Sequence, residues 1–365
     1  MLIFRRVVAI LLLFLIAIPS LLAPVYRFPT PQPFTGASLW NPYAHLLGPW
    51  QKVNLHAHGK AWGGVTNGKQ TDEEVVRAYK QRGYAVAGVS NYASIAAFRG
   101  VDTIPLYEHG YNIPKIHQLA IGARRVVWLD FPFWQTLDQK QFIIDRVGAA
   151  ADLVSINHPN TGYTDEDMRN LTGYQLIEIV NGPFPVEDVW DAALSAGHVV
   201  WALGNDDAHD VTNLKRTFIA WNMINAPGAS AAEIIGALRQ GRSYAVSLVG
   251  NNADAALDSL DVKDATMTVR SSGVPATYLF VGQDGAVRGT ANQVTEASYT
   301  FAATDTYIRT VIRTPNMVMY VNPVLRYDGA ALPSPVSTVD ETSTWLHRGV
   351  ILIIAAAVLF FLWRR

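Results

Sequence analysis

The chain has 365 residues, enough for two or three domains, and half of them are apolar, so a disordered protein is excluded. The net charge of −1 excludes a broad basic surface, and nucleic-acid binding is not expected. The absence of cysteine excludes disulfides, thiolate metal ligands and cysteine nucleophiles.

The first 25 residues predict a membrane anchor. Residues 7–23 are almost entirely apolar and follow Arg5 and Arg6. A signal peptide has the same pattern, and a stretch of 17 residues is short for a membrane span. Residues 21–23 followed by Pro24 form a poor cleavage site, so an uncleaved anchor is favoured over a signal peptide. The proline-rich residues 26–50 predict a linker.

Residues 51–250 alternate between two patterns. Short apolar segments typical of strands lie at residues 53–55, 84–89, 118–121, 153–156, 176–180 and 199–203. Helical patterns lie at residues 71–83, 139–147, 186–196 and 231–240. The first of them begins with a capping box formed by Thr71 and Glu74. This alternation predicts an α/β domain in which helices cover a parallel sheet or barrel.

The pattern changes in residues 251–332. Segments 266–269, 278–281, 299–301 and 310–312 are strand-like, and no convincing helix occurs among them. Asp284-Gly285 is a hairpin-turn signal. These residues predict a small antiparallel β-sandwich domain.

The end of the chain predicts a second membrane helix. After a linker at residues 333–344, residues 345–365 contain an uninterrupted apolar run at 350–362, with Trp345 and Trp363 on either side and Arg364-Arg365 at the end. These flanks favour a transmembrane helix over a buried C-terminal helix. With both terminal arginine pairs in the cytoplasm, the residues between the anchors would lie on the extracytoplasmic side of the cell membrane.

Histidines and carboxylates gather close to the strand-like segments of residues 51–250. These candidate residues are His56, His58, Glu108, His117, His158, Asp207 and His209. In α/β barrels the carboxyl ends of the strands form the rim that carries the active site. Imidazoles and carboxylates that converge there suit a divalent Zn, Mn or Fe ion.

The order of these motifs resembles that of a known family. His56-Ala57-His58, then Glu108, His117, Asn157-His158-Pro159 and Asp207-Ala208-His209 are similar to the motifs of the polymerase-and-histidinol-phosphatase (PHP) domain superfamily. Residues 237–244 and the β domain after them resemble its carbaryl-hydrolase-like branch. The resemblance covers about residues 51–328. It implies a distorted (β/α)7 barrel that holds two or three metal ions and hydrolyses phosphate esters or other esters.

The resemblance also implies ligands for each ion. His56, His58, Glu108 and Asp207 would hold one ion, Glu108 would also bind a second ion with His117 and His158, and His209 would belong to a third site. Glu108 and Asp207 would thereby serve catalysis.

Two departures from the family pattern fall on the third site. Ser90-Asn91-Tyr92 stands where the family has Thr-Asp-His, and residues 60–70 contain neither His nor Asp. We therefore expect two metal ions per chain and hydrolysis by a metal-activated hydroxide.

Two neighbouring residues offer alternatives as ligands. His109 could replace Glu108, and Asp206 could replace Asp207, although the Asp-x-His spacing favours Asp207.

Other polar residues are expected to support the site. Glu178 and Asn181 are candidates for orienting the imidazoles, and Lys60 and Arg242 are candidates for binding an anionic substrate. The sequence thus predicts a membrane-anchored, metal-dependent phosphoesterase for a small-molecule or lipid-derived substrate. The alternatives are a PHP-like domain that binds a ligand with weak or no catalysis, and a hydrolase of esters, amides or carbamates.

Overall fold

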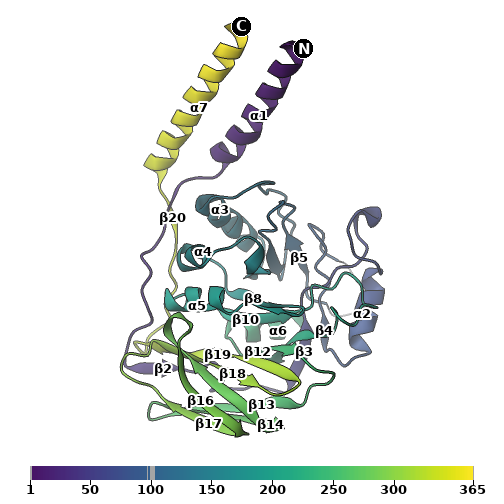
Figure 1. The fold of residues 1–365 in the computed structure, drawn as a ribbon, viewed down its shortest axis with the longest axis vertical. Helices are drawn as coiled ribbons and strands as arrows, with labels where there is room; N and C mark the ends of the chain where they lie inside the picture. The colour runs from purple at the N-terminus through teal and green to yellow at the C-terminus, as the bar shows by residue number, and fades with distance from the viewer. Residues whose placement is uncertain (1, 97, 99–102, 365) are drawn as a thin grey trace.

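The computed structural model describes residues 2–96, 98 and 103–364, which form a mixed α/β fold with several sheets (Figure 1). The helices are α1 (Leu2–Leu22), α2 (Asp72–Lys80), α3 (Leu137–Gly148), α4 (Asp165–Asn170), α5 (Asp188–Ser195), α6 (Ala231–Arg239) and α7 (Glu341–Arg364). The predicted capping box of Thr71 and Glu74 is confirmed at the start of α2.

One of the two large sheets carries several of the candidate ligands in or next to its strands. Its strands are β5 (Leu106–His109), β6 (Gln118–Ile121), β7 (Leu153–Ile156), β8 (Leu176–Asn181), β9 (Phe184–Pro185) and β10 (Trp201–Asn205), in the order β10-β8-β7-β6-β5 with β9 on β8. β7, β8 and β10 are parallel, but β6 is antiparallel to both β5 and β7. The expectation of a wholly parallel sheet is therefore wrong, because residues 110–117 join β5 directly to β6 without a crossover helix.

A second sheet runs through both predicted domains. Its strands follow the order β16-β15-β18-β19-β12-β11-β3-β4, with β2 on β19. Their bounds are β2 (Ser38–Trp40), β3 (Trp50–Asn54), β4 (Val86–Ala87), β11 (Ala220–Asn225), β12 (Ser243–Leu248), β15 (Ala276–Val281), β16 (Val287–Val294), β18 (Tyr307–Arg313) and β19 (Met317–Tyr327). β12 pairs antiparallel with β19, so the segments before and after residue 250 share one sheet.

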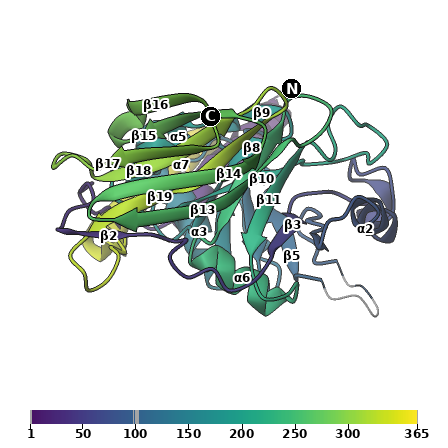
Figure 2. The same cartoon turned by 90° about the horizontal axis from the view of Figure 1, so that it is seen from below.

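Three further antiparallel strands complete the C-terminal part of the molecule (Figure 2). They are β13 (Ala255–Lys263), β14 (Thr266–Gly273) and β17 (Glu296–Thr300). Leu260, Val269, Phe280 and Ile312 belong to one apolar cluster that joins these strands to β15 and β18. The three strands therefore pack as a second layer against part of the sheet that continues into residues before 250.

The two large sheets do not close into a barrel in the described residues. Two isolated backbone bridges link the two sheets: Ala57, after β3, pairs with Ala208, after β10, and Tyr92, after β4, pairs with Glu108 in β5. Along β10, backbone N–H groups donate instead to buried asparagine side chains, in the pairs Ala202–Asn322, Gly204–Asn222 and Asp206–Asn54, at 2.9, 2.9 and 3.0 Å. A closed seven-stranded barrel is therefore not shown: the two sheets meet through isolated backbone bridges and through these side chains. Asn205 acts in the same way, since its Oδ1 accepts from the Leu55 N–H at 2.8 Å. We call Asn54, Asn205, Asn222 and Asn322 the asparagine seam.

The predicted linker at residues 26–50 packs against the body. Phe34 and Tyr43 are buried, and the Tyr43 hydroxyl donates to the Ser243 carbonyl at 2.6 Å. Residues 26–50 are therefore part of the folded structure, because their aromatic side chains fill its core.

The terminal helices α1 and α7 lie side by side and project from the body, so both termini lie at the same end (Figure 1). Arg348 Nε donates to the Leu21 carbonyl at 2.9 Å, and β1 (Tyr26–Arg27) pairs with β20 (Thr338–Val339). Among the described residues only α7 is long and apolar enough to cross a membrane, since the apolar part of α1, Arg6–Leu22, is shorter. The expectation of two spanning helices is supported for α7 alone. Arg365, expected in the cytoplasm, lies outside the described residues.

Candidate metal centre

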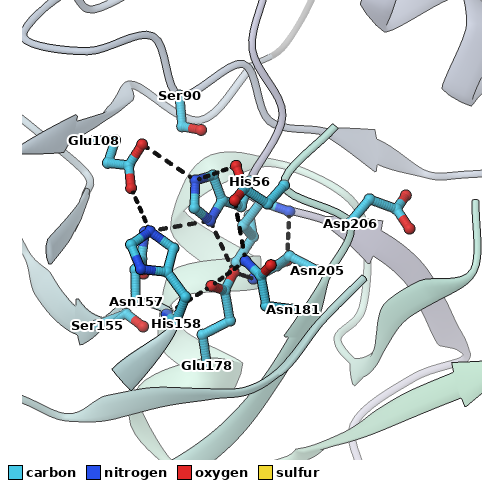
Figure 3. Close-up of polar contacts among 12 residues, drawn as sticks. His56, Ser90, Glu108, Ser155, Asn157, His158, Glu178, Asn181, Asn205 and Asp206 are labelled. Carbon is cyan, nitrogen blue, oxygen red and sulfur yellow. Dashed lines mark hydrogen bonds and ion pairs between the residues drawn. The ribbon is translucent and has the colours of Figure 1, made fainter. Parts of the chain in front are cut away.

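The structure brings the seven candidate ligands together at one edge of the two large sheets. His56 and His58 follow β3, Glu108 lies in β5, His117 precedes β6, His158 follows β7, and Asp207 and His209 follow β10. His117 reaches this edge because β6 is antiparallel to its neighbours and starts where they end. Figure 3 shows His56, Glu108 and His158 facing one another.

Four of these side chains direct one atom each towards a common point. The atoms are His56 Nε2, His58 Nε2, Glu108 Oε2 and Asp207 Oδ1, and five of the six distances among them are 3.2 or 3.3 Å. Four tetrahedral ligands at about 2.0–2.1 Å from an ion would lie about 3.3–3.4 Å apart. The four atoms therefore have the spacing of a tetrahedral metal shell.

Hydrogen bonds alone do not account for this spacing. His56 Nδ1 lies 2.8 Å from Glu178 Oε1, so in the neutral imidazole the proton lies on Nδ1 and Nε2 presents a lone pair. Glu108 Oε2 and Asp207 Oδ1 are buried and have no hydrogen-bond partner. A buried carboxylate oxygen beside an imidazole nitrogen needs positive charge between them. A proton on the imidazole supplies it when metal is absent, and a divalent ion, whose tetrahedral shell this spacing fits, supplies it when metal is bound.

Glu108 faces a second group of ligands with its other oxygen. Glu108 Oε1 lies 2.9 Å from His117 Nδ1 and 3.0 Å from His158 Nε2, and the three residues are close enough to hold one ion. The ring of His158 is oriented by Thr161, whose Oγ1 lies 3.1 Å from His158 Nδ1. A carboxylate with one oxygen in each of two ligand groups is suited to bridge two ions.

His209 extends the cluster on the side of Asp207. His209 Nε2 lies 3.3 Å from Asp207 Oδ1, and the His209 ring stacks on that of His58 with centroids 4.4 Å apart. Tyr92 also stacks on His58, at 4.6 Å. Burial and the carboxylates of Glu108 and Asp207 raise the pKa of Tyr92, so the phenol stays protonated and is a poor ligand.

Glu178, a buried residue of β8, holds two of the imidazole residues in place (Figure 3). Its Oε1 accepts from His56 Nδ1 at 2.8 Å and from Asn205 Nδ2 at 3.0 Å. Its Oε2 accepts from the backbone N–H of His158 at 3.0 Å and from Asn181 Nδ2 at 2.9 Å. This geometry fits the orienting role expected of Glu178, whereas Asn181 acts on Glu178 rather than on an imidazole.

The charges of the cluster stabilise one another. Burial acts to lower the pKa of His56, but the carboxylates of Glu178, Asp207 and Glu108 outweigh it and hold that pKa well above its usual value. Carboxylates likewise raise the pKa values of His58 and His158 against the effect of burial. Burial acts to raise the pKa values of Glu108 and Asp207, and the facing imidazoles hold both well below their usual range. Both carboxylates are therefore ionised, as metal ligands must be.

The two alternative ligands face away from the cluster. Asp206 accepts hydrogen bonds from the Tyr79 hydroxyl at 2.6 Å and from three backbone N–H groups at 2.8–2.9 Å. Burial raises the pKa of Asp206 to about 6, and Figure 3 shows its side chain pointing outwards. His109 Nδ1 lies 2.9 Å from Gln118 Oε1, and its Nε2 lies 2.9 Å from the Leu129 carbonyl.

The backbone is strained at two of the candidate ligands. His158 has φ 28° and Asp207 has φ 49°, in the left-handed region that residues other than glycine seldom adopt. Strain of this kind persists where the surrounding structure enforces it, often at functional sites. Here it turns both side chains towards Glu108 and His56.

The two candidate substrate-binding residues are placed differently. Lys60 is exposed, two residues after His58. The Arg242 carbonyl accepts from the Asn225 N–H, and Asn225 pairs with Trp50 at the start of β3. Arg242 therefore lies at the opposite end of β3 from His56, because β12 is antiparallel to β11. The expectation that Arg242 binds substrate at this site is not supported by the structure.

No family model and no curated protein sequence matches the chain. A solved structure from Bacteroides vulgatus ATCC 8482, a two-domain protein containing a predicted PHP-like metal-dependent phosphoesterase, is similar to it over 86% of this chain and 99% of that chain. The two share 12% sequence identity with a TM-score of 0.40, values too low to transfer residue roles or activity. The carbaryl-hydrolase-like branch is not confirmed by these comparisons.

Proposed function

We propose that the chain is a metal-dependent hydrolase that binds two divalent ions and acts on a phosphoester. The observation that carries the proposal is the tetrahedral spacing of His56 Nε2, His58 Nε2, Glu108 Oε2 and Asp207 Oδ1, in which both carboxylate oxygens lack a hydrogen-bond partner. The second oxygen of Glu108, which faces two further imidazoles, supports a second ion. The donor set of nitrogen and oxygen atoms suits Zn, Mn or Fe.

Two divalent ions bound there would activate a water molecule and neutralise charge on a phosphoryl group. The chain's own residues prepare the site for this chemistry. Glu178 keeps the proton of His56 on Nδ1, so Nε2 is free to bind. Glu108 and Asp207 remain ionised, and Lys60, exposed two residues after His58, would supply a positive charge for an anionic substrate.

We further propose that α7 anchors the enzyme in the cell membrane, with α1 beside it and the body on the extracytoplasmic side. α7 has an 18-residue apolar window of which none is buried against the rest of the chain. An uncovered apolar surface of this size is unfavourable in water and is stabilised in a bilayer. The basic residues at both ends of the chain favour the cytoplasmic side for the termini.

Metal analysis of the purified full-length chain, combined with a panel of phosphomonoesters, phosphodiesters and carboxyl esters, tests the proposed activity. We expect two ions per chain and hydrolysis of at least one phosphoester class. Hydrolysis of carboxyl esters alone would replace the phosphoesterase by an esterase. Bound metal without any hydrolysis would favour a binding domain.

Two substitutions test the number of ions. His158→Ala removes a ligand from the second group, so occupancy should fall towards one ion per chain and most hydrolysis should be lost. Tyr92→Phe removes a hydroxyl that is not expected to bind metal, so the stoichiometry should not change. Three tightly bound ions in the unmodified chain would contradict the two-ion proposal.

A further inference from the structure

Five large apolar side chains are exposed on segments that are connected to the metal centre. They are Trp62, Tyr111, Ile113, Trp128 and Trp134, each between 51% and 75% exposed, and we call them the apolar rim. A group of exposed aromatic and aliphatic side chains of this kind marks an interaction surface. Trp and Tyr in particular are favoured where an apolar phase meets water.

The apolar rim is connected to the metal centre at two places. Tyr111 and Ile113 lie in the loop between Glu108 and His117, two candidate ligands. Trp62 Nε1 donates to the Tyr92 carbonyl at 2.8 Å, and the Tyr92 ring stacks on His58.

The members of the rim are also connected to one another. The rings of Trp62 and Trp128 meet edge to face at 5.7 Å. The Ile113 N–H donates to the Pro132 carbonyl at 2.9 Å, which joins the loop of the ligands to the loop that carries Trp134.

The rim continues onto the terminal helices. Residues 131–134 and five residues of α1, namely Leu12, Leu15, Ile16, Pro19 and Ser20, line one cavity of about 250 Å³. Arg348 of α7 bonds to the Leu21 carbonyl, two residues before the apolar run at 350–362. The α1 residues beside Trp134 therefore lie at the level of the apolar part of α7, so a bilayer that surrounds α7 would reach Trp134.

We propose that the apolar rim rests in the membrane interface and presents the metal centre to a membrane-borne phosphoester, such as a lipid head group. This inference rests on the hydrolase and the anchor proposed above, and it names their substrate class. In the reaction, the oxygen of a water molecule forms a new bond to phosphorus, the ester P–O bond breaks, and the released lipid alcohol takes up a proton from that water. A substrate embedded in the bilayer would reach the site without leaving the membrane.

The absence of cysteine allows a direct measurement of the depth of the rim. Trp134→Cys and Trp128→Cys each create a single site for a fluorescent label, and Val287→Cys in β16, 56% exposed, is the matched control. With the full-length chain in phosphatidylcholine vesicles, doxyl-labelled lipid should quench the label at 134 and 128 much more than the label at 287. Equal quenching at all three positions would overturn the proposal. A label at 134 or 128 that neither a lipid quencher nor a water-soluble quencher reaches would also overturn the proposal, because another protein surface would then cover the rim.

Activity separates this inference from the proposed function. The metal-loaded chain in phosphatidylcholine vesicles is given two matched pairs, phosphatidic acid with glycerol 3-phosphate and phosphatidylglycerol with glycerophosphoglycerol. For at least one pair we expect the lipid to be hydrolysed faster than its water-soluble counterpart. Because two Trp side chains leave the interface, Trp128→Ser with Trp134→Ser should lower this rate ratio about tenfold. Val249→Ser with Val287→Ser, at exposed positions that are not part of the rim, should not lower the ratio.

The outcomes are distinguishable. Hydrolysis of the soluble esters at the same rate as the lipids, with no effect of the Trp substitutions, would overturn the membrane-borne substrate and leave the hydrolase intact. No hydrolysis of any of the four compounds by metal-loaded protein, although label quenching places the rim in the bilayer, would overturn the phosphoesterase itself.

Discussion

Glu178→Gln is a sharp test of the metal centre, because one side chain there accepts four hydrogen bonds. Glutamine has the same shape but only one accepting oxygen. If that oxygen faces His56 and Asn205, the amide group faces two other donors, the His158 N–H and Asn181 Nδ2. Each donor that loses its acceptor costs about 1–3 kcal/mol, so we expect the free energy of unfolding to fall by about 2–6 kcal/mol.

The same substitution should weaken metal binding. Loss of the carboxylate that orients a ligating imidazole typically lowers metal affinity about 10–100-fold, which corresponds to about 1.4–2.7 kcal/mol. The affinity would be measured by competition with a chromophoric chelator, and the stability by denaturant unfolding of chelator-treated protein. Glu73→Gln, at an exposed position of α2, is the control and should change neither quantity. A folded Glu178→Gln protein with unchanged affinity would refute the view that Glu178 prepares His56 for a metal ion.

Three further results are expected. Asp191→Asn should lower the free energy of unfolding by about 1–3 kcal/mol, because it removes the carboxylate that lies 2.6 and 2.7 Å from the buried Arg309 guanidinium and leaves Glu187, 2.7 Å from Arg309 Nη1, as its charge partner. Denaturant unfolding measures this change, and a loss under about 1 kcal/mol would contradict it. Arg270→Gln, which removes two exposed ion pairs, should change the free energy of unfolding by less than about 1 kcal/mol. Chelator-treated protein should melt at a higher temperature at pH 6 than at pH 8, since imidazoles with raised pKa values add stability that is lost as pH rises through those values, and the opposite order would contradict the cluster's electrostatics.

Parts of the fold could be predicted from local patterns. The strands at residues 118–121 and 153–156 have the predicted bounds, and the capping box at Thr71 begins a helix as expected. β5 was not predicted, because its four residues, Leu106 to His109, include two polar ones and resemble a loop. The direction of β6 also could not be predicted, since a short connection without a helix is visible only once β5 is recognised.

The candidate site was predictable in composition but not in its supporting contacts. The Asp-x-His spacing alone favoured Asp207 over Asp206. In the structure the Asp207 carboxylate faces His56, whereas backbone N–H groups bind the Asp206 carboxylate on the side away from the cluster. The sequence did not show that Arg242 lies at the opposite end of the sheet from the site. A basic residue between a helix and a strand does not reveal at which end of the sheet that strand starts. Asn205, which supports Glu178, gave no signal, since its partners at Leu55 and Glu178 are distant in sequence.

The asparagine seam has a consequence for hydrogen exchange. The backbone amides of Leu55, Ala202, Gly204 and Asp206 have side-chain acceptors, at 2.8–3.0 Å, in place of a neighbouring strand. Their protons are nevertheless enclosed, because all four asparagines are fully buried. These four amides should exchange with solvent deuterium as slowly as amides inside a sheet, and they should become labile only when the two sheets separate. Their exchange rates therefore report the opening of the junction between the two sheets.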